Sequence, residues 1–361
     1  MLVTNPLTDE ELVVREVING TTDTVRLSLL RALKSLSNPV VQTDAAEQAD
    51  VTRQAASSHF AILRDRGFVN SYDGEIELTG GGIVFLRVLD DCLEVMSLGK
   101  LSDLTRSNHA VSILQELEKR SYRLSELQTA VDGSPSRSTL KRNLDNFKKH
   151  GWCSETAGSF QIESDGTQAL SAYSELVLAV EQLIEKSTWF LRLPPEDATL
   201  PVQELADADL VTSNSGRPGS VLWAALRLYD RKTSYFRALS SIYHPVLFFG
   251  HELMLDFGFD PEAEVILDLP TYLDAAENPY TSHIVNDSYR ECYQPLVLNH
   301  AHTLGIGIYD DRKVAIGAYN EYGRGNHTVM IVSTNTRLVQ WGIELYESYR
   351  QKADRAPDID V

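Results

Sequence analysis

Two stretches of this chain repeat each other at a spacing of 84 residues, without a gap. The run VTRQAASSHFAILRDRGF (residues 51–68) falls on PSRSTLKRNLDNFKKHGW (residues 135–152). Further on, EIELT (75–79) falls on SFQIE (159–163). Self-similarity at a fixed offset indicates a duplicated structural unit. Three apolar pairs upstream keep the spacing: Leu29 with Ile113, Leu30 with Leu114, and Leu33 with Leu117.

Each copy has the pattern of a helix, a short helix, a Ser/Thr-capped helix, a glycine turn and a strand pair. Hydroxyl and carboxylate side chains cap helix N-termini, and glycine accepts the left-handed conformation after a helix. Asp-Gly is the dipeptide of tight hairpin turns. This order predicts tandem winged helix-turn-helix modules in an α+β or α/β multidomain protein. In the first copy the signals are Thr22 or Asp23, Thr43, Thr52, Gly67 and the turn at Asp73-Gly74.

The third helix of such a module enters the DNA major groove with its N-terminal residues against the base edges. Arginine reads guanine, glutamine and asparagine read adenine, and lysines contact phosphates. We therefore expect double-stranded DNA as a partner. The candidate contacts in the first copy are Thr52, Arg53, Gln54, Ser57, Ser58 and His59, and in the second copy Ser136, Arg137, Ser138, Lys141, Arg142, Asn143, Lys148 and Lys149.

The remaining segments suggest a third domain. Apolar helices are expected at 83–98 and 168–190, and we expect them to support a homodimer. A proline pair in 193–198 marks a linker, and short β-rich runs after it predict an α/β sensor domain. The expected parts are 8–98, 103–191, 200–352 and a flexible tail at 353–361. The expected strands are 246–249, 265–269, 296–298, 305–309, 314–318 and 328–332, with helices at 221–228 and 338–349.

Charge argues against a simple DNA binder, because 33 basic and 51 acidic residues give a net charge of -18. Either the protein does not bind DNA, or it works in a salt-rich cytoplasm where an acidic surface favours solubility. The scarcity of lysine beside arginine favours the second, halophilic interpretation. Residues 119–149 are locally basic, with eight basic and three acidic residues. Three scattered cysteines, the absence of a signal sequence and the lack of a long apolar run predict a cytoplasmic protein without membrane association.

Two family resemblances follow from these motifs. The run 51–69 resembles the recognition helix and turn of ArsR/MarR-type winged-helix repressors. Residues 245–352 resemble the effector domain of archaeal methanogenesis-regulator-like transcription factors, of which haloarchaeal members share a "lGAY" strand and a closing "WgieLYe.YR" helix. Those motifs stand here at 317–319 and 341–350. The resemblance implies a DNA-binding transcriptional regulator with a non-catalytic sensory domain, and this chain departs from the simplest form in carrying two winged helices.

Other functions have less support in the sequence. No GxSxG, P-loop or HExxH motif is present, so we expect neither an enzyme nor a cofactor. A metal or hydrolase site built from His300, His302, His327, Asp310 and Glu321 is weaker than their interpretation as ordinary surface or core residues. An adaptor that uses its winged helices to bind proteins is the main alternative to DNA binding. A small-molecule effector could bind the polar-aromatic group of Tyr309, Tyr319, Asn320, Tyr322, Arg324 and His327.

Overall fold

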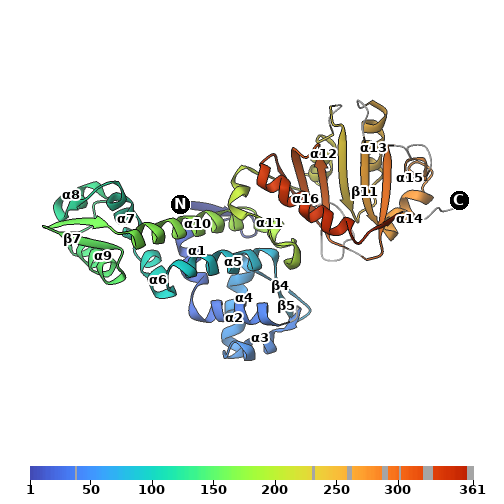
Figure 1. The fold of residues 1–361 in the computed structure, drawn as a ribbon. Helices are drawn as coiled ribbons and strands as arrows, with labels where there is room; N and C mark the ends of the chain where they lie inside the picture. Colours follow the sequence, from blue (N-terminus) through green and yellow to red (C-terminus); the bar gives the residue numbers. More distant parts are fainter. Residues whose placement is uncertain are drawn as a thin grey trace. The chain divides into compact units, whose positions relative to one another are not determined.

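The computed structural model describes residues 1–36, 39–229, 232–257, 262–286, 292–300, 302–319 and 328–355. The chain divides into two compact units, one made of 1–78 and 82–185 and the other of 79–81 and 186–361 (Figure 1). No helix in these described ranges is both long and apolar enough to cross a membrane.

The first copy of the repeat has the predicted order of elements. Helix α2 (Thr24–Ser35) is capped by Asp23, whose side chain accepts a hydrogen bond from the backbone N–H of Val25. The short strand β3 (Val40–Val41) and helix α3 (Gln42–Gln48) follow, and helix α4 (Arg53–Asp65) is capped by Thr52. Strands β4 (Val69–Tyr72) and β5 (Glu75–Leu78) form the hairpin. The predicted cap at Thr43 is wrong, because α3 begins one residue earlier and Val41 precedes it.

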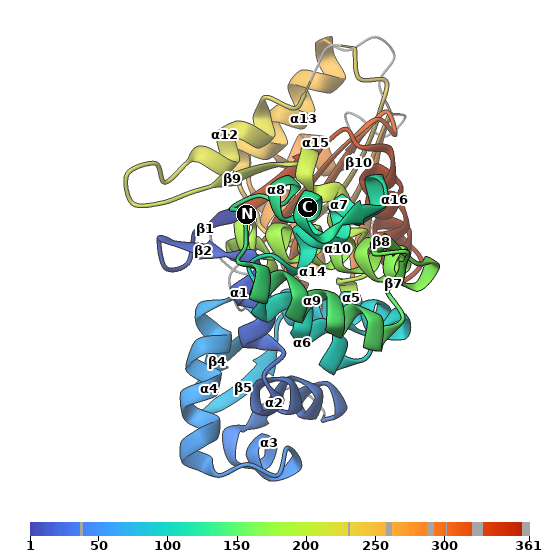
Figure 2. The same ribbon diagram turned by 90° about the vertical axis from the view of Figure 1, so that its left-hand side faces the viewer.

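The second copy repeats this order (Figure 2). Its elements are α7 (Ala110–Lys119), β6 (Tyr122–Arg123), α8 (Leu124–Ala130), α9 (Arg137–His150), β7 (Cys153–Thr156) and β8 (Ser159–Ile162). In both copies, the short strand pairs antiparallel with the second hairpin strand, which gives the orders β3-β5-β4 and β6-β8-β7. Gly67 and Gly151 adopt φ values of 75° and 77° after α4 and α9, as expected for left-handed helix ends.

The structural repeat is not free of gaps, which corrects the prediction. Helices α4 and α9 and both hairpins keep the 84-residue offset, but β3-α3 and β6-α8 are offset by 82 residues. Buried Ala45 therefore corresponds to buried Leu127. The connection before the short strand is two residues shorter in the second copy, and the loop before α9 is two residues longer. A comparison without gaps does not detect this shift, because the two length changes compensate before the next motif.

Other elements hold the first unit together. An N-terminal hairpin of β1 (Leu2–Asn5) and β2 (Glu10–Val13) leads into α1 (Val14–Thr21). Helix α5 (Gly80–Val95) precedes α6 (Leu98–Arg106), and α10 (Ser164–Glu185) contacts α1, α7 and β1. The apolar residues of α10 that suggested a dimer interface, such as Leu170, Leu176 and Val180, are buried, whereas Leu178 is exposed.

The second unit is built on one mixed sheet. Within the described residues this sheet has eight strands in the order β16-β12-β11-β10-β13-β14-β15-β9. Strands β10, β11 and β12 are parallel, and the remaining neighbours are antiparallel. The strands are β9 (Asp209–Thr212), β10 (Tyr235–Ser240), β11 (Glu262–Asp268), β12 (Tyr293–Leu298), β13 (Leu304–Tyr309), β14 (Lys313–Ala318), β15 (Val329–Ser333) and β16 (Asp354–Arg355).

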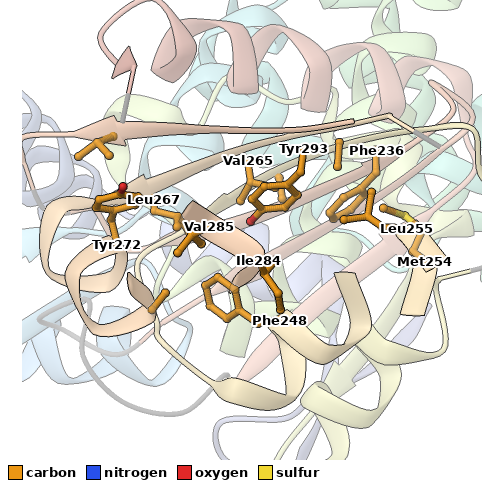
Figure 3. Close-up of a cluster of buried hydrophobic side chains, with 14 of the residues drawn as sticks. Phe236, Phe248, Met254, Leu255, Val265, Leu267, Tyr272, Ile284, Val285 and Tyr293 are labelled. Carbon is orange, nitrogen blue, oxygen red and sulfur yellow. The ribbon is translucent and has the colours of Figure 1, made fainter. Parts of the chain in front are cut away.

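Helices cover both faces of this sheet. Side chains from Phe248 and Ile284 on the helices and from Phe236, Val265 and Tyr293 on the strands point toward one another in a buried cluster (Figure 3). On the opposite face Gly342 of α16 approaches Val314 and Ile316. The helical elements are α11 (Ser187–Phe190), the 3-10 turns Pro195–Asp197 and Val202–Asp207, α12 (Ser220–Leu226), α13 (Pro245–Phe257), α14 (Leu269–Glu277), α15 (Ser282–Asn286) and α16 (Thr336–Arg350).

Two predictions for this unit are wrong. The apolar run 246–249 lies in helix α13 and not in a strand, because a short apolar run fits a buried helix as well as a strand. Asp354 and Arg355, assigned to a flexible tail, form β16 and pair with Val297 and Leu296. The other five predicted strands correspond to β11, β12, β13, β14 and β15.

Candidate nucleic-acid interface

The N-terminus of α9 presents a group of exposed polar side chains. Ser136 caps the helix, since its Oγ accepts a hydrogen bond of 3.1 Å from the backbone N–H of Thr139. The same Oγ lies 2.9 Å from the hydroxyl groups of Ser138 and Thr139. The cap fixes the orientation of the first helical turn, and the side chain of Arg137 on that turn is exposed to solvent.

Three cations on α9 are available for an external partner. Arg137, Lys141 and Arg142 are exposed, and in the described part of the chain no carboxylate pairs with any of them. Lys141 comes four residues after Arg137, so these two side chains lie on the same face of the helix. Arg142 is the next residue. Unpaired basic side chains at the start of an exposed helix suit binding to phosphates and guanine.

The end of α9 is less available. Lys148 Nζ lies 3.0 Å from Glu155 and 3.3 Å from Asp145, and the hydrogen bond to Glu155 is the main reason that the pKa of Lys148 is raised. Lys149 is exposed. Of the two predicted phosphate contacts at this end, Lys149 is therefore the freer.

Two predicted DNA contacts turn inward. Asn143 is buried, and its side-chain N–H donates 2.9 Å to the carbonyl of Thr139, one turn earlier. His59, at the equivalent position of α4, is half-buried with its Nδ1 at 3.2 Å from Arg26 Nη1. Helical periodicity explains both positions, because each lies one residue before a buried core residue, Leu144 or Phe60.

The first copy exposes similar residue types with less positive charge. Thr52, Arg53, Gln54, Ser57 and Ser58 are all exposed. Helix α4 contains two basic residues and one acidic residue, whereas α9 contains five and one. The adjacent hairpin also differs, since that of the first copy carries Asp73, Glu75 and Glu77, and that of the second carries Glu155 alone.

Sequence reasoning missed the residues that anchor α9. Helix α6 places Asp103 Oδ2 2.9 Å from His150 Nε2, and Lys100 Nζ donates 3.2 Å to the carbonyl of His150. Lys100 also lies 5.8 Å from the centre of the Trp152 ring. A cation at a helix C-terminus satisfies an unpaired carbonyl and stabilises the helix. No local pattern could reveal this contact, because α6 was not predicted as a separate helix.

The predicted effector residues are only partly described. Tyr309 and Tyr319 are buried, with exposed fractions of 5% and 1%. Asn320, Tyr322, Arg324 and His327 lie outside the described residues. Burial raises the pKa of both described tyrosines, so their hydroxyl groups stay protonated near neutral pH.

The described residues of the histidine and carboxylate group, for which a metal site was the weaker interpretation, include one with a clear structural role. The Asp310 carboxylate accepts hydrogen bonds from the backbone N–H groups of Ser234 and Tyr235, at 2.8 and 2.9 Å. His300 is exposed and His302 is buried, while Glu321 and His327 are not among the described residues. Across the described ranges, no three His, Cys, Asp or Glu side chains gather as metal ligands would.

His302 makes the second unit sensitive to acid. Burial lowers its pKa from 6.5 to about 4, so the unfolded chain binds a proton that the folded chain excludes between these values. His302 therefore does not reduce the free energy of unfolding above pH 6.5. As the pH falls toward 4, His302 lowers this free energy, by about 2 kcal/mol at pH 5. Urea unfolding at pH 7 and pH 5, compared between the unmodified protein and the His302→Phe variant, isolates this loss, because buried His251, whose pKa is also lowered, contributes equally to both. His302→Phe should reduce it and His300→Phe, at an exposed site, should not. Equal acid sensitivity in the two variants would contradict the assignment.

Comparisons with known proteins give two family matches. Residues 98–183 match the model of the HVO_A0261 N-terminal domain, and residues 225–352 match that of the middle domain of the methanogenesis regulatory protein FilR1. No curated protein matches the chain.

Similar solved structures include TrmBL2, an archaeal chromatin protein described as showing a novel mode of DNA binding. It has a TM-score of 0.32 and 13% identity, over 75% of this chain and 98% of that chain. NucT from Helicobacter pylori has a TM-score of 0.32 and 12% identity, over 41% and 98%. Phosphatidylserine synthase from Haemophilus influenzae Rd KW20 has a TM-score of 0.29 and 11% identity, over 71% and 54%. These distant likenesses support no functional argument.

The match over residues 225–352 confirms the resemblance inferred from the 317–319 and 341–350 motifs. The chain is thus similar to a domain of a methanogenesis regulatory protein in its second unit, and to the HVO_A0261 N-terminal domain over most of α6 to α10.

Proposed function

We propose that this protein is a sequence-specific DNA-binding transcriptional regulator without catalytic activity. The observation that carries the proposal is the capped N-terminus of α9, where Arg137, Lys141 and Arg142 are exposed and unpaired among the described residues. The similarity of residues 225–352 to a domain of a regulatory protein supports the same role. In this proposal both copies of the repeat are winged helix-turn-helix modules, with α4 and α9 as recognition helices.

We further propose that the second copy is the main DNA reader. DNA affinity depends on the neutralisation of phosphates, and α9 carries more positive charge than α4. The acidic hairpin of the first copy would repel phosphates where the wing approaches the backbone. The direct contacts would come from Ser136, Arg137, Ser138, Lys141 and Arg142, with Lys149 on phosphate.

The proposal assigns three functional parts to the chain: modules at 8–98 and 103–191, and a sensor domain at 200–352. We propose that the regulator works as a homodimer in a salt-rich cytoplasm, and that a small-molecule effector acts through the sensor domain. An effector changes DNA affinity only if it binds the two affinity states of the protein unequally.

The proposal predicts an order of effects among arginine variants. Arg137→Ala and Arg142→Ala should each weaken DNA binding by about tenfold, as expected for the loss of an arginine contact to a base or phosphate. Arg53→Ala should have a smaller effect. The measurement is fluorescence polarisation in multimolar KCl, with duplexes that the full-length protein has enriched from a randomised pool.

Lys148→Ala provides a matched control on the same helix, because Lys148 already pairs with Asp145 and Glu155. It should change affinity less than Arg137→Ala does. The reverse order for Arg53 and Arg137 would assign the reading role to the first copy. Failure to enrich any duplex would favour the protein-interaction adaptor.

A further inference from the structure

A hollow lies at one edge of the sheet in the second unit. Strand β9 is the last strand of the described sheet, and a loop joins it to helix α12 (Figure 2). The strand, the loop and the helix together line the hollow, which opens to solvent and has a volume of about 690 Å³. Sites for small molecules in proteins have volumes of about 300–1,000 Å³, so this hollow is large enough for one.

The wall of this hollow includes an exposed indole ring. Val211 of β9 and Ala224 of α12 line the hollow and also pack against the buried cluster of Figure 3. A Cβ atom on Gly219 would lie 3.2 Å from Cδ1 and 3.3 Å from Nε1 of Trp223, so the indole ring lies against the backbone at this glycine. Nevertheless, 63% of Trp223 is exposed. The ring therefore offers a flat apolar surface on which a second planar ring can stack.

Two arginines give the hollow its charge. Arg217 and Arg227 line it and are exposed, and no carboxylate pairs with either of them in the described part of the chain. The chain has 51 acidic residues, yet no Asp or Glu is among the lining residues. Ser220 also lines the hollow, and its hydroxyl group donates a hydrogen bond of 3.1 Å to the carbonyl of Arg217. Two guanidinium groups without a counter-charge favour an anionic ligand, and phosphate fits their paired donors.

Hydrogen bonds within the loop hold the backbone of Arg217 in place. Asn214 Oδ1 accepts hydrogen bonds of 3.0 Å from the backbone N–H groups of Gly216 and Arg217. Ser213 Oγ accepts one of 3.1 Å from the backbone N–H of Val221, which connects the start of the loop to α12. The loop is thus ordered by its own contacts, so a ligand need not supply the free energy to order it.

We propose that this hollow binds a planar aromatic ring joined to a phosphate group, which is the chemistry of a mononucleotide. The ring stacks on Trp223, and Arg217 and Arg227 hold the phosphate. A phosphate monoester carries a charge of about -1.5 to -2 near pH 7, which two guanidinium groups match. Identification of this molecule as the effector rests on the proposed function. The binding itself does not, because it can be measured without DNA.

AMP, adenosine and ribose 5-phosphate are matched probes for this site. Adenosine lacks the phosphate, and ribose 5-phosphate lacks the aromatic ring. Isothermal titration calorimetry on the full-length protein, at one fixed KCl concentration, measures the three affinities. We expect AMP to bind about tenfold more tightly than either of the other two, because each of them loses either the charge-assisted hydrogen bonds or the stacking.

Tryptophan fluorescence gives an independent readout of the stacking. The other three tryptophans of the chain, Trp152, Trp189 and Trp341, are buried, with exposed fractions of 5% or less. Quenching of the emission by acrylamide therefore reports mainly on Trp223. AMP should protect this emission from acrylamide, and ribose 5-phosphate should not. Unchanged quenching at a saturating AMP concentration would contradict stacking on Trp223.

Variants of exposed residues test the assignment without changing the core. The double variant Arg217→Gln, Arg227→Gln should lower the AMP affinity by about tenfold, to that of adenosine. Trp223→Ala should lower it to that of ribose 5-phosphate. Arg337→Gln is the matched control, because Arg337 is an exposed arginine of the same unit that pairs with Glu204 and does not line the hollow.

Three results would overturn the proposal: AMP affinity no higher than that of adenosine and ribose 5-phosphate, AMP affinity unchanged in the double arginine variant, or an equal loss in Arg337→Gln. Absence of DNA binding with normal AMP binding would instead contradict only the proposed function.

Discussion

Replacement of Gly166 by alanine is expected to destabilise the first unit by about 3 kcal/mol, at the upper end of the usual cost of overpacking. A Cβ atom there would lie 2.2 Å from the carbonyl oxygen of Trp152 and 2.8 Å from Ile162. The carbonyl cannot move freely, because it accepts a hydrogen bond of 2.9 Å from the backbone N–H of Glu163. Urea unfolding monitored by circular dichroism measures the effect.

Gly82→Ala should behave in the same way, because its Cβ would lie 2.2 Å from the carbonyl oxygen of Phe68. Gly99→Ala is the matched control. It lies in helix α6, with Ser97 Oγ at 4.0 Å as its nearest neighbour, so the better helix propensity of alanine should raise stability by up to about 1 kcal/mol. A Gly166→Ala variant as stable as Gly99→Ala would contradict this account and show that helix α10 can shift away from the hairpin.

Arg350→Met is expected to destabilise the second unit by about 2–3 kcal/mol, because it removes two charge-assisted hydrogen bonds from a buried carboxylate, while the Arg350 side chain itself is 46% exposed and screened by solvent. Arg350 donates two hydrogen bonds to Glu264, at 2.7 and 2.9 Å, and Tyr346 donates a third at 2.9 Å. Only 9% of the Glu264 side chain is exposed. Buried Arg237, paired with Glu347 and Asp311, adds positive charge nearby. Denaturant unfolding of the full chain gives the stability difference.

The double variant Arg350→Met, Glu264→Leu tests the cause. Because it removes both charges, it should recover most of the lost stability. The effect should also depend on pH. Burial alone would raise the pKa of Glu264, but the hydrogen bonds of Arg350 and Tyr346 bring it below its ordinary value of 4.5. The stabilisation is thus complete above pH 4.5 and is lost as the pH falls further. An equal loss in the single and double variants would contradict this account.

Much of the first unit could be predicted, because its helix caps and turns depend on residues that are close together in the sequence. The caps at Asp23, Thr52 and Ser136 and the turn at Asp73-Gly74 depend on contacts within four residues, so the sequence contains all that is needed to infer them. Helix α6 was missed, because the predicted apolar helix ended at 98 and Ser97 was not recognised as the cap of a further helix.

The candidate sites were predictable only in part. The exposed face of α9 follows from helical periodicity, and strict use of that periodicity would also have excluded Asn143. The hollow beside β9 could not be inferred, because β9 was not among the predicted strands and the hollow depends on how β9 and α12 pack against the core. His251 lies in helix α13, which begins at Pro245 and contains the whole run predicted as a strand, so the orientation of His251 could not be derived either.

The same carbonyl–glycine contact occurs in both halves of the duplicated region, at Phe68 with Gly82 and at Trp152 with Gly166. A gene duplication that copies such a contact also copies its intolerance of mutation, because only hydrogen fits at either glycine. The exposed positions of α4 and α9 carry no such steric constraint, and their charges have diverged. The two modules therefore share one way of packing the hairpin carbonyl against the following helix, while the exposed residues of α4 and α9 remain free to differ in charge.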